Sequence, residues 1–137
     1  MTFLVERLAE LRLHLKHLRD LAPRVRDAES LRADLSLHND VLFSLLVVCQ
    51  GVIDIAGELA GRRGIRFEDY TEAVRALKLV EGIPAPLVDQ LAVLPGFRNV
   101  LVHEYIALDY DRVTEALRQL DPIEEFVRLV ARLEGQG

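Results

Sequence analysis

Apolar residues recur at intervals of three and four along most of this chain, a spacing that places them on one face of an α-helix. In residues 3–21 the apolar positions alternate with charged ones, and the repeating residues are Leu4, Leu8, Leu11, Leu15 and Leu18. Pro23 follows this segment and cannot continue a helix. The pattern therefore predicts a first amphipathic helix over residues 3–21.

The second helical segment is apolar on every side at its centre. The stretch "VLFSLLVVC", residues 41–49, lies between flanks that return to helical alternation, and such a segment is typical of the buried centre of a bundle. We therefore predict a long helix from Leu31 to about Ala60, ended by the glycines in residues 61–64. The apolar run is about half the roughly 20 residues that a membrane span needs, so we expect a soluble protein with no membrane contact.

Three further segments have helical spacing, and they cover residues 67–82, 83–105 and 108–133. Within the second of them, the sequence predicts a helix over residues 86–105 that kinks or restarts at Pro95-Gly96. Pro122 predicts a similar interruption of the third. The tail of residues 134–137 is expected to be frayed.

The chain has no convincing strand pattern and no internal repeat. Its 137 residues suit one domain with one core, and 50% hydrophobic with 28% charged residues is typical of a soluble folded protein. We therefore predict a single all-α domain over residues 1–137, built as an up-and-down bundle of about five helices.

The net charge and the single cysteine exclude several classes of function. A net charge of −5 argues against a protein that neutralises long nucleic acid over its whole surface, although a local basic patch remains compatible with it. Cys49 is the only cysteine, so neither a disulfide nor a cysteine metal cluster can form within the chain. The N-terminal segment carries charges at every turn and does not resemble a signal peptide, so we expect a cytoplasmic protein in a reducing compartment.

One helical segment combines polar groups of different chemistry. It is "GFRNVLVHEY", residues 96–105, and its polar residues are Arg98, Asn99, His103, Glu104 and Tyr105. On a regular helix, Phe97, Val100 and Leu101 would face the core, and Arg98, Asn99, His103 and Tyr105 would lie on the solvent side. The candidate chemistry of the chain therefore lies on one face of this helix.

Arginine and histidine together have the chemistry for cleaving RNA without a metal. Histidine exchanges protons near neutral pH, and arginine binds a phosphate through two parallel hydrogen bonds. His103 would move the proton, and Arg98 would stabilise the charge that develops on the phosphoryl oxygens. Too few carboxylates and histidines lie nearby in the sequence to predict a metal site. On residue type alone, a solvated helix end with a hydrogen-bonded histidine is the simpler interpretation.

A resemblance to a known family changes this balance. Arg98, His103 and Tyr105 stand in the pattern R-x4-H-x-Y, which resembles the signature of HepT-like toxins within the HEPN superfamily. The surrounding residues resemble the form "GFRNxLxHxY", and "VIDIAGELA", residues 52–60, resembles the long central helix of that family. The resemblance covers roughly residues 34–131 and leaves the first helix generic.

The resemblance implies a homodimeric, HEPN-like ribonuclease toxin whose two motif copies line a cleft between the subunits. It would cleave transfer or messenger RNA without a metal or a cofactor of its own, with Arg98 and His103 as catalytic residues and Asn99 supporting them. Its antitoxin would be a minimal nucleotidyltransferase that uses ATP to place AMP on Tyr105. An added AMP brings bulk and negative charge close to an arginine that must receive a phosphate.

Other polar residues have both a structural and a functional interpretation. Asp54, between two isoleucines, would either pair two helices or support the site by orienting Arg98 or His103. The arginines at positions 62, 63 and 66 are either solvated or an RNA contact. His14 and His17 have a spacing that suits a metal, but no third ligand is apparent.

Two other functions remain open at this stage. The chain would alternatively be a non-catalytic HEPN-like subunit that partners a nucleotidyltransferase, or a structural dimerisation bundle with a degenerate motif. The intact Arg98, His103 and Tyr105 argue against the bundle. They do not separate the enzyme from the binding subunit.

Overall fold

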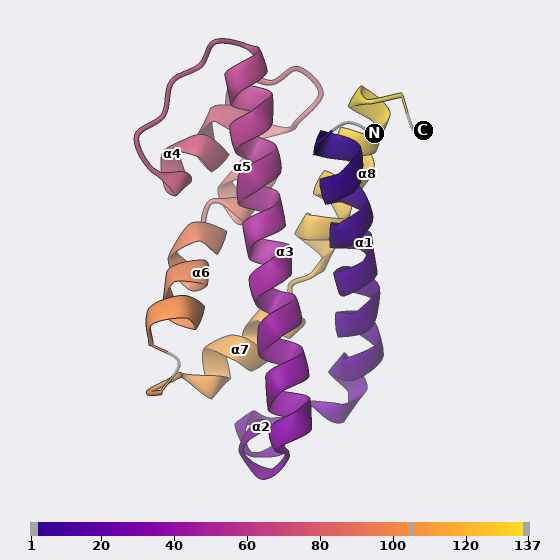
Figure 1. Ribbon diagram of the computed structural model, residues 1–137, viewed down its shortest axis with the longest axis vertical. Helices are drawn as coiled ribbons and strands as arrows, with labels where there is room; N and C mark the ends of the chain where they lie inside the picture. The colour runs from indigo at the N-terminus through magenta and orange to yellow at the C-terminus, as the bar shows by residue number, and fades with distance from the viewer. Residues whose placement is uncertain (1–2, 105, 136–137) are drawn as a thin grey trace.

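The protein is a bundle of α-helices in the computed structural model, which describes residues 3–104 and 106–135 (Figure 1). Its helices are α1 (Phe3–Leu21), α2 (Ala28–Ala33), α3 (Leu35–Arg62), α4 (Tyr70–Arg75), α5 (Ala85–Leu91), α6 (Leu94–His103), α7 (Tyr110–Leu117) and α8 (Asp121–Leu133), with 3-10 turns η1 (Ala22–Arg24) and η2 (Ala76–Leu79). No strand occurs in the described part of the chain. The all-α prediction is confirmed, and α1 has the bounds that the leucine spacing predicts.

The predicted count of about five helices is too low because three predicted helices are divided. Asp34 separates α2 from α3: its backbone is extended, and its side chain accepts a hydrogen bond from the Leu37 N–H and so caps a new helix. The predicted interruption of the helix over residues 86–105 is present, but its predicted position is wrong. The helix is divided into α5 and α6 at Ala92 and Val93, just before Pro95 and not at Pro95-Gly96. Pro95 lies in the first turn of α6, where a missing N–H costs little. The third, over residues 108–133, is divided into α7 and α8 just before Pro122, where the sequence predicts an interruption.

The long helix α3 runs through the middle of the molecule with α1 along one side and α6 along the other (Figure 1). Helix α3 lies close against α1 at Gly51, where an added Cβ would lie 2.8 Å from Leu11 Cγ. A side chain at this position would push the two helices apart. Glycine at position 51 therefore permits the close packing on which the site described below depends.

The apolar centre of α3 is the core of the bundle. By length and composition alone α3 is able to cross a membrane, but 56% of its most apolar window is buried by the other helices, as in the core helix of a soluble protein. Cys49 is buried, and this burial raises the pKa of its thiol to about 12. The thiol therefore stays protonated and behaves as a small apolar side chain.

Candidate functional site

Helix α6 presents the polar motif, but not all of it to solvent. Phe97 and Leu101 are buried in the core, as their spacing predicts, while Asn99 and His103 are exposed. Arg98 is half-buried against α3, which corrects the prediction that it points outward with the other polar residues. Helix α6 ends at His103, and Glu104 is its C-cap. Tyr105 itself lies outside the described residues.

The Arg98 guanidinium is held by groups from three helices. Its Nε donates a hydrogen bond to Gln50 Oε1 on α3 at 2.9 Å, and its Nη1 donates to Asn99 Oδ1 on α6 at 3.2 Å. Its Cζ lies 5.6 Å from the centre of the Tyr70 ring at the start of α4, within cation–π range. Among the described residues, none accepts from Nη2. The cation is thus fixed on one edge and available on the other.

Asp54 is connected to Arg98 indirectly. Gln50 Nε2 donates a hydrogen bond to Asp54 Oδ1 at 2.8 Å, and Arg7 Nε of α1 lies 3.6 Å from Asp54 Oδ2. Asp54 therefore pairs α1 with α3, and it reaches Arg98 only through Gln50. It makes no hydrogen bond or ion pair with His103 among the described residues, so any orienting role must act on Arg98 through the glutamine.

A cavity of about 380 Å³ opens between α1, α3 and α6 beside these groups. It is lined by Arg7, Glu10, Leu11, Leu46, Val47, Gln50, Gly51, Asp54, Arg98 and Val102. Arginines from two different helices face the same space, and an arginine is well suited to bind a phosphate. Glu10 and Asp54 line it as well, so the formal charges of its lining balance, and Arg98 is the arginine with an edge left to bind a phosphate.

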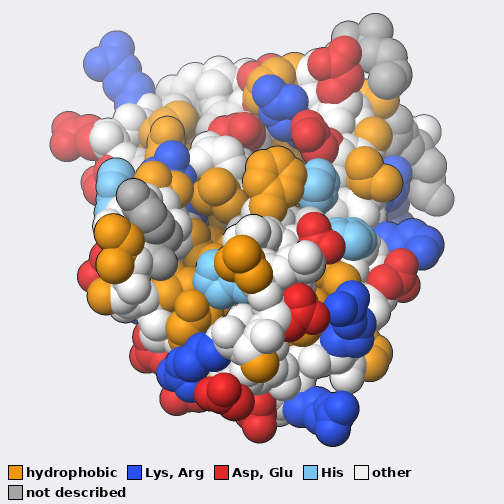
Figure 2. All heavy atoms as spheres, turned by 60° about the horizontal axis from the view of Figure 1, so that its bottom comes forward, with side chains coloured by type: hydrophobic (Ala, Val, Ile, Leu, Met, Phe, Trp, Pro, Cys, Tyr) orange, Lys and Arg blue, Asp and Glu red, His pale blue; other side chains and the backbone are white. Residues whose placement is uncertain are grey.

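His103 lies at the edge of this region, in the last turn of α6. Its position four residues after Asn99 places both side chains on one face of the helix. His103 is exposed, so it is accessible to a large substrate. Figure 2 shows histidine side chains at separate places on the face at the lower end of the bundle, among hydrophobic and charged side chains.

The two histidines of α1, His14 and His17, have structural partners on α3. His14 Nδ1 is 2.9 Å from the Ser44 hydroxyl, and His17 Nε2 is 3.8 Å from Asp40 Oδ2. Over the described residues, no group of three or more histidine, cysteine or acidic side chains is arranged to hold a metal ion. The i, i+3 histidine spacing on α1 is therefore explained by two separate contacts with α3.

The arginine cluster after α3 is mostly tied to its own surroundings. Arg62 forms ion pairs with Glu134 at 2.8 Å and with Glu58 at 3.5 Å, and Arg63 Nη1 donates to the Leu59 carbonyl at 3.1 Å. These contacts favour the structural interpretation of Arg62 and Arg63.

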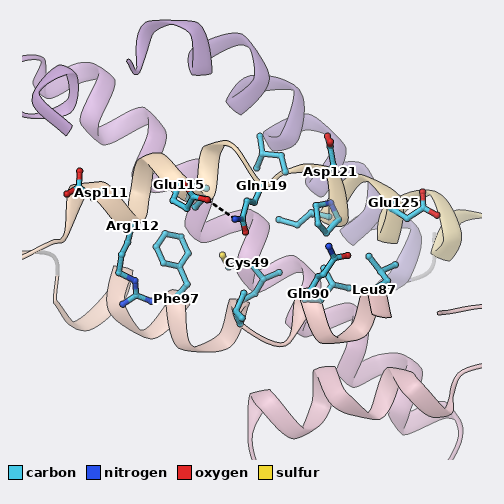
Figure 3. Close-up of a pocket in the computed structure, with 18 residues that line it drawn as sticks. Cys49, Leu87, Gln90, Phe97, Asp111, Arg112, Glu115, Gln119, Asp121 and Glu125 are labelled. Carbon is cyan, nitrogen blue, oxygen red and sulfur yellow. Dashed lines mark hydrogen bonds between the residues drawn. The ribbon is translucent and has the colours of Figure 1, made fainter. Parts of the chain in front are cut away.

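A larger cavity of about 1050 Å³ lies between α3, α5, α6, α7 and α8 (Figure 3). Its floor is apolar, with Leu45, Cys49 and Phe97, and it contains none of the candidate residues of the motif. Its rim carries one arginine and several carboxylates, namely Arg112, Asp111, Glu115, Asp121 and Glu125. Because carboxylates repel phosphates, this cavity is a poor site for RNA despite its size.

The sequence did not identify Gln50, Arg7 or Tyr70 as part of the site. Gln50 and Asp54 are four residues apart, a spacing that brings side chains together on a helix, and this signal was available. Arg7 belongs to a helix with no distinctive pattern, and Tyr70 starts a short helix far from the motif in sequence. Their roles depend on packing between helices, which periodicity does not reveal.

Comparison with known proteins gives matches along most of the chain. The family described as ribonuclease HepT-like matches residues 11–130. The protein named mRNA nuclease HepT from Shewanella oneidensis is 26% identical over 106 residues, which are 76% of this chain and 80% of that protein. An Archaeoglobus fulgidus protein with a provisional RNase name is 35% identical over 94 residues, which are 66% of this chain and 69% of that protein.

A solved structure shares the fold described above. It is the tri-AMPylated Shewanella oneidensis HEPN toxin in complex with MNT antitoxin, with a TM-score of 0.80 and 24% sequence identity. The superposition covers 96% of this chain and 99% of that one. The bundle, with α1 included, therefore has the fold of a HEPN toxin.

Proposed function

Because this chain belongs to the ribonuclease HepT-like family, we propose that it is a toxin that cleaves cellular RNA without a metal ion and is neutralised by AMPylation. The observation that carries the proposal is the arrangement of Arg98 and His103 on α6. Arg98 is braced by Gln50 and Asn99 with Nη2 directed to no described residue, and His103 is exposed one turn after Asn99 on the same helix. The names of the two relatives support RNA as the substrate.

The proposed reaction uses the 2′-hydroxyl of RNA as the nucleophile. His103 takes the proton from the 2′-oxygen, which attacks the phosphorus, or gives a proton to the 5′-oxygen as the bond between phosphorus and that oxygen breaks. Arg98 binds the phosphoryl oxygens, whose negative charge increases in the transition state. No electron transfer and no further reactant is required.

A single histidine cannot serve as base and acid at the same time, and we propose that a second copy of the chain supplies the other one. The exposed position of His103 at the end of α6 leaves it accessible to such a partner. Two copies of the motif would then line one cleft in a homodimer. We place this reaction in the cytoplasm and away from membranes, where cellular RNA is the substrate.

Neutralisation is proposed to act at Tyr105 through a minimal nucleotidyltransferase that uses ATP. The tri-AMPylated toxin bound to MNT antitoxin supports this partner and this modification. The tyrosine follows His103 by two residues in the sequence. A phosphodiester on it would add negative charge two residues from His103 in sequence, and would compete with the RNA phosphate for Arg98.

We expect the purified protein to cleave RNA in the presence of EDTA as fast as in its absence, because the proposed chemistry needs only side chains. Cleavage of a fluorescent oligoribonucleotide, with the same sequence carrying 2′-deoxyribose as the control, measures this. The deoxy oligonucleotide should stay intact, since it lacks the nucleophile. Intact RNA under all conditions would contradict the ribonuclease proposal and favour the non-catalytic binding subunit.

AMPylation is expected to depend on one tyrosine. Incubation with the cognate nucleotidyltransferase and ATP should add one or more AMP groups by mass spectrometry and stop RNA cleavage. Tyr105→Phe should remove the main adduct and keep the protein active in the presence of the partner. Tyr110→Phe is a matched control, because Tyr110 lies at the start of α7 and packs edge-on against His38. An adduct that persists in Tyr105→Phe would show that the modified residue is a different one.

A further inference from the structure

We propose that Gln50 is a positioning residue for RNA cleavage, because its side-chain amide fixes the Arg98 guanidinium by linking it to Asp54. The inference rests on the proposed function, in which Arg98 stabilises the charge of the reacting phosphate. Gln50 lies on α3 and Arg98 on α6, 48 residues apart in sequence. Gln50 touches neither the reacting atoms nor His103 among the described residues, so its effect must pass through Arg98.

The two hydrogen bonds of Gln50 permit only one orientation of its amide. The oxygen accepts from Arg98 Nε at 2.9 Å, and the nitrogen donates to Asp54 Oδ1 at 2.8 Å. In the reverse orientation, an N–H would face the Arg98 N–H and the amide oxygen would face a carboxylate. The arginine and the aspartate therefore hold the glutamine, and the glutamine in turn holds the arginine.

Asp54 is itself anchored by α1. Arg7 Nε is buried and makes no hydrogen bond in the described part of the chain, so the ion pair with Asp54 at 3.6 Å is what offsets the cost of burying it. The Arg7 guanidinium also lies over the Phe3 ring, 4.8 Å from its centre. The result is a polar chain, Arg7–Asp54–Gln50–Arg98, that runs across α1, α3 and α6 along the wall of the smaller cavity.

A neutral acceptor at position 50 suits the proposed reaction better than a carboxylate. A glutamate there would pair with Arg98 and cancel much of the charge that the phosphate requires, and it would repel Asp54 one turn away. A glutamine restrains the long arginine side chain, which otherwise loses rotamer freedom on binding substrate. It leaves the positive charge intact, so Arg98 is oriented in advance and remains attractive to RNA.

Gln50→Met tests the inference because methionine keeps the length of the side chain and removes both hydrogen bonds. We expect kcat for RNA cleavage to fall by about 10- to 100-fold, since a small displacement of a catalytic group has effects of this size. The melting temperature should stay close to that of the wild type. Gln90→Met is the matched control on the exposed surface of α5 and should keep the wild-type kcat. A wild-type kcat in Gln50→Met would overturn the inference.

A pair of isosteric changes separates positioning from general packing. Gln50→Glu alone should lower kcat by at least as much as Gln50→Met, because two carboxylates then face each other. Adding Asp54→Asn restores the hydrogen bond between positions 50 and 54 in the opposite direction, because the new amide at position 54 donates to the new carboxylate at position 50. We expect kcat to recover at least about 5-fold over Gln50→Glu. If the double variant melts at the same temperature as Gln50→Glu and its kcat is no higher, the link through Asp54 does not exist.

An activity-independent readout keeps this inference distinct from the proposed function. In the wild type, the Arg98 Nε–Hε group should exchange slowly with water and give a resolved NMR signal, identified by its loss in Arg98→Lys. Gln50→Met should shift this signal and speed its exchange, whereas Gln90→Met should not. A protein that binds no RNA but shows this change would refute the ribonuclease proposal and retain Gln50 as the group that holds Arg98. An unchanged signal in Gln50→Met would refute the inference, whatever the activity.

Discussion

His103→Ala is expected to lower the rate of RNA cleavage by about 10²- to 10⁴-fold, the usual contribution of a general acid or base. The histidine is exposed at the end of α6, and no contact of its side chain with another described residue is seen, so its removal should leave the fold intact. Kinetics with an oligoribonucleotide under single-turnover conditions report this loss directly. If the wild type and His103→Ala melt at the same temperature, the lost rate is due to the missing proton transfer and not to unfolding.

The control for this change is a histidine of similar exposure outside the motif. His17→Ala removes a side chain on α1 that lies 3.8 Å from Asp40 Oδ2, and it should cleave RNA at the wild-type rate. In a bacterial host, expression of the wild type and of His17→Ala should arrest growth and degrade RNA, while expression of His103→Ala should not. Equal growth and equally intact RNA for all three proteins would contradict the assignment of His103.

The helical architecture was predictable because burial in a bundle depends on local periodicity. The leucine spacing of α1 reports directly which face is buried, and its bounds follow from that face and from Pro23. The all-apolar centre of α3 likewise indicates its place in the core. Breaks were harder to place, because an aspartate such as Asp34 reads as an ordinary polar position until its side chain caps the next helix.

The candidate site was only partly predictable, for a related reason. Arg98, Asn99 and His103 are close in sequence, so a motif reveals them. The residues that determine how Arg98 points come from α1, α3 and α4, and they include Arg7, Gln50 and Tyr70. An amphipathic pattern predicts which side of a helix meets solvent, but not whether a long side chain on that side folds back against a neighbouring helix. For this reason Arg98 was expected to be exposed and is in fact braced.

Phe126→Ala is expected to have the largest effect on stability, without the same effect on chemistry. Phe126 of α8 is fully buried and is the largest of the completely enclosed side chains in the described core. Its truncation leaves a cavity and should lower the free energy of unfolding by about 3–5 kcal/mol. That loss is a large fraction of the roughly 5–15 kcal/mol that stabilises a typical domain, and it corresponds to a melting temperature lower by on the order of 10 °C or more.

Phe43→Ala removes the same atoms from a ring that is 61% exposed, and it isolates the contribution of burial. The Phe43 ring meets only the edge of His14 among the described rings, with 5.8 Å between ring centres, so its loss should cost less than about 1 kcal/mol. Urea titrations of both variants measure the two free energies of unfolding.

Well below its melting temperature, Phe126→Ala should still cleave RNA at nearly the wild-type rate, because α8 contributes no residue to the cavity beside Arg98. If Phe126→Ala were as stable as Phe43→Ala, α8 would not be packed as the structure shows. If it were folded but inactive, the site would extend beyond α1, α3 and α6.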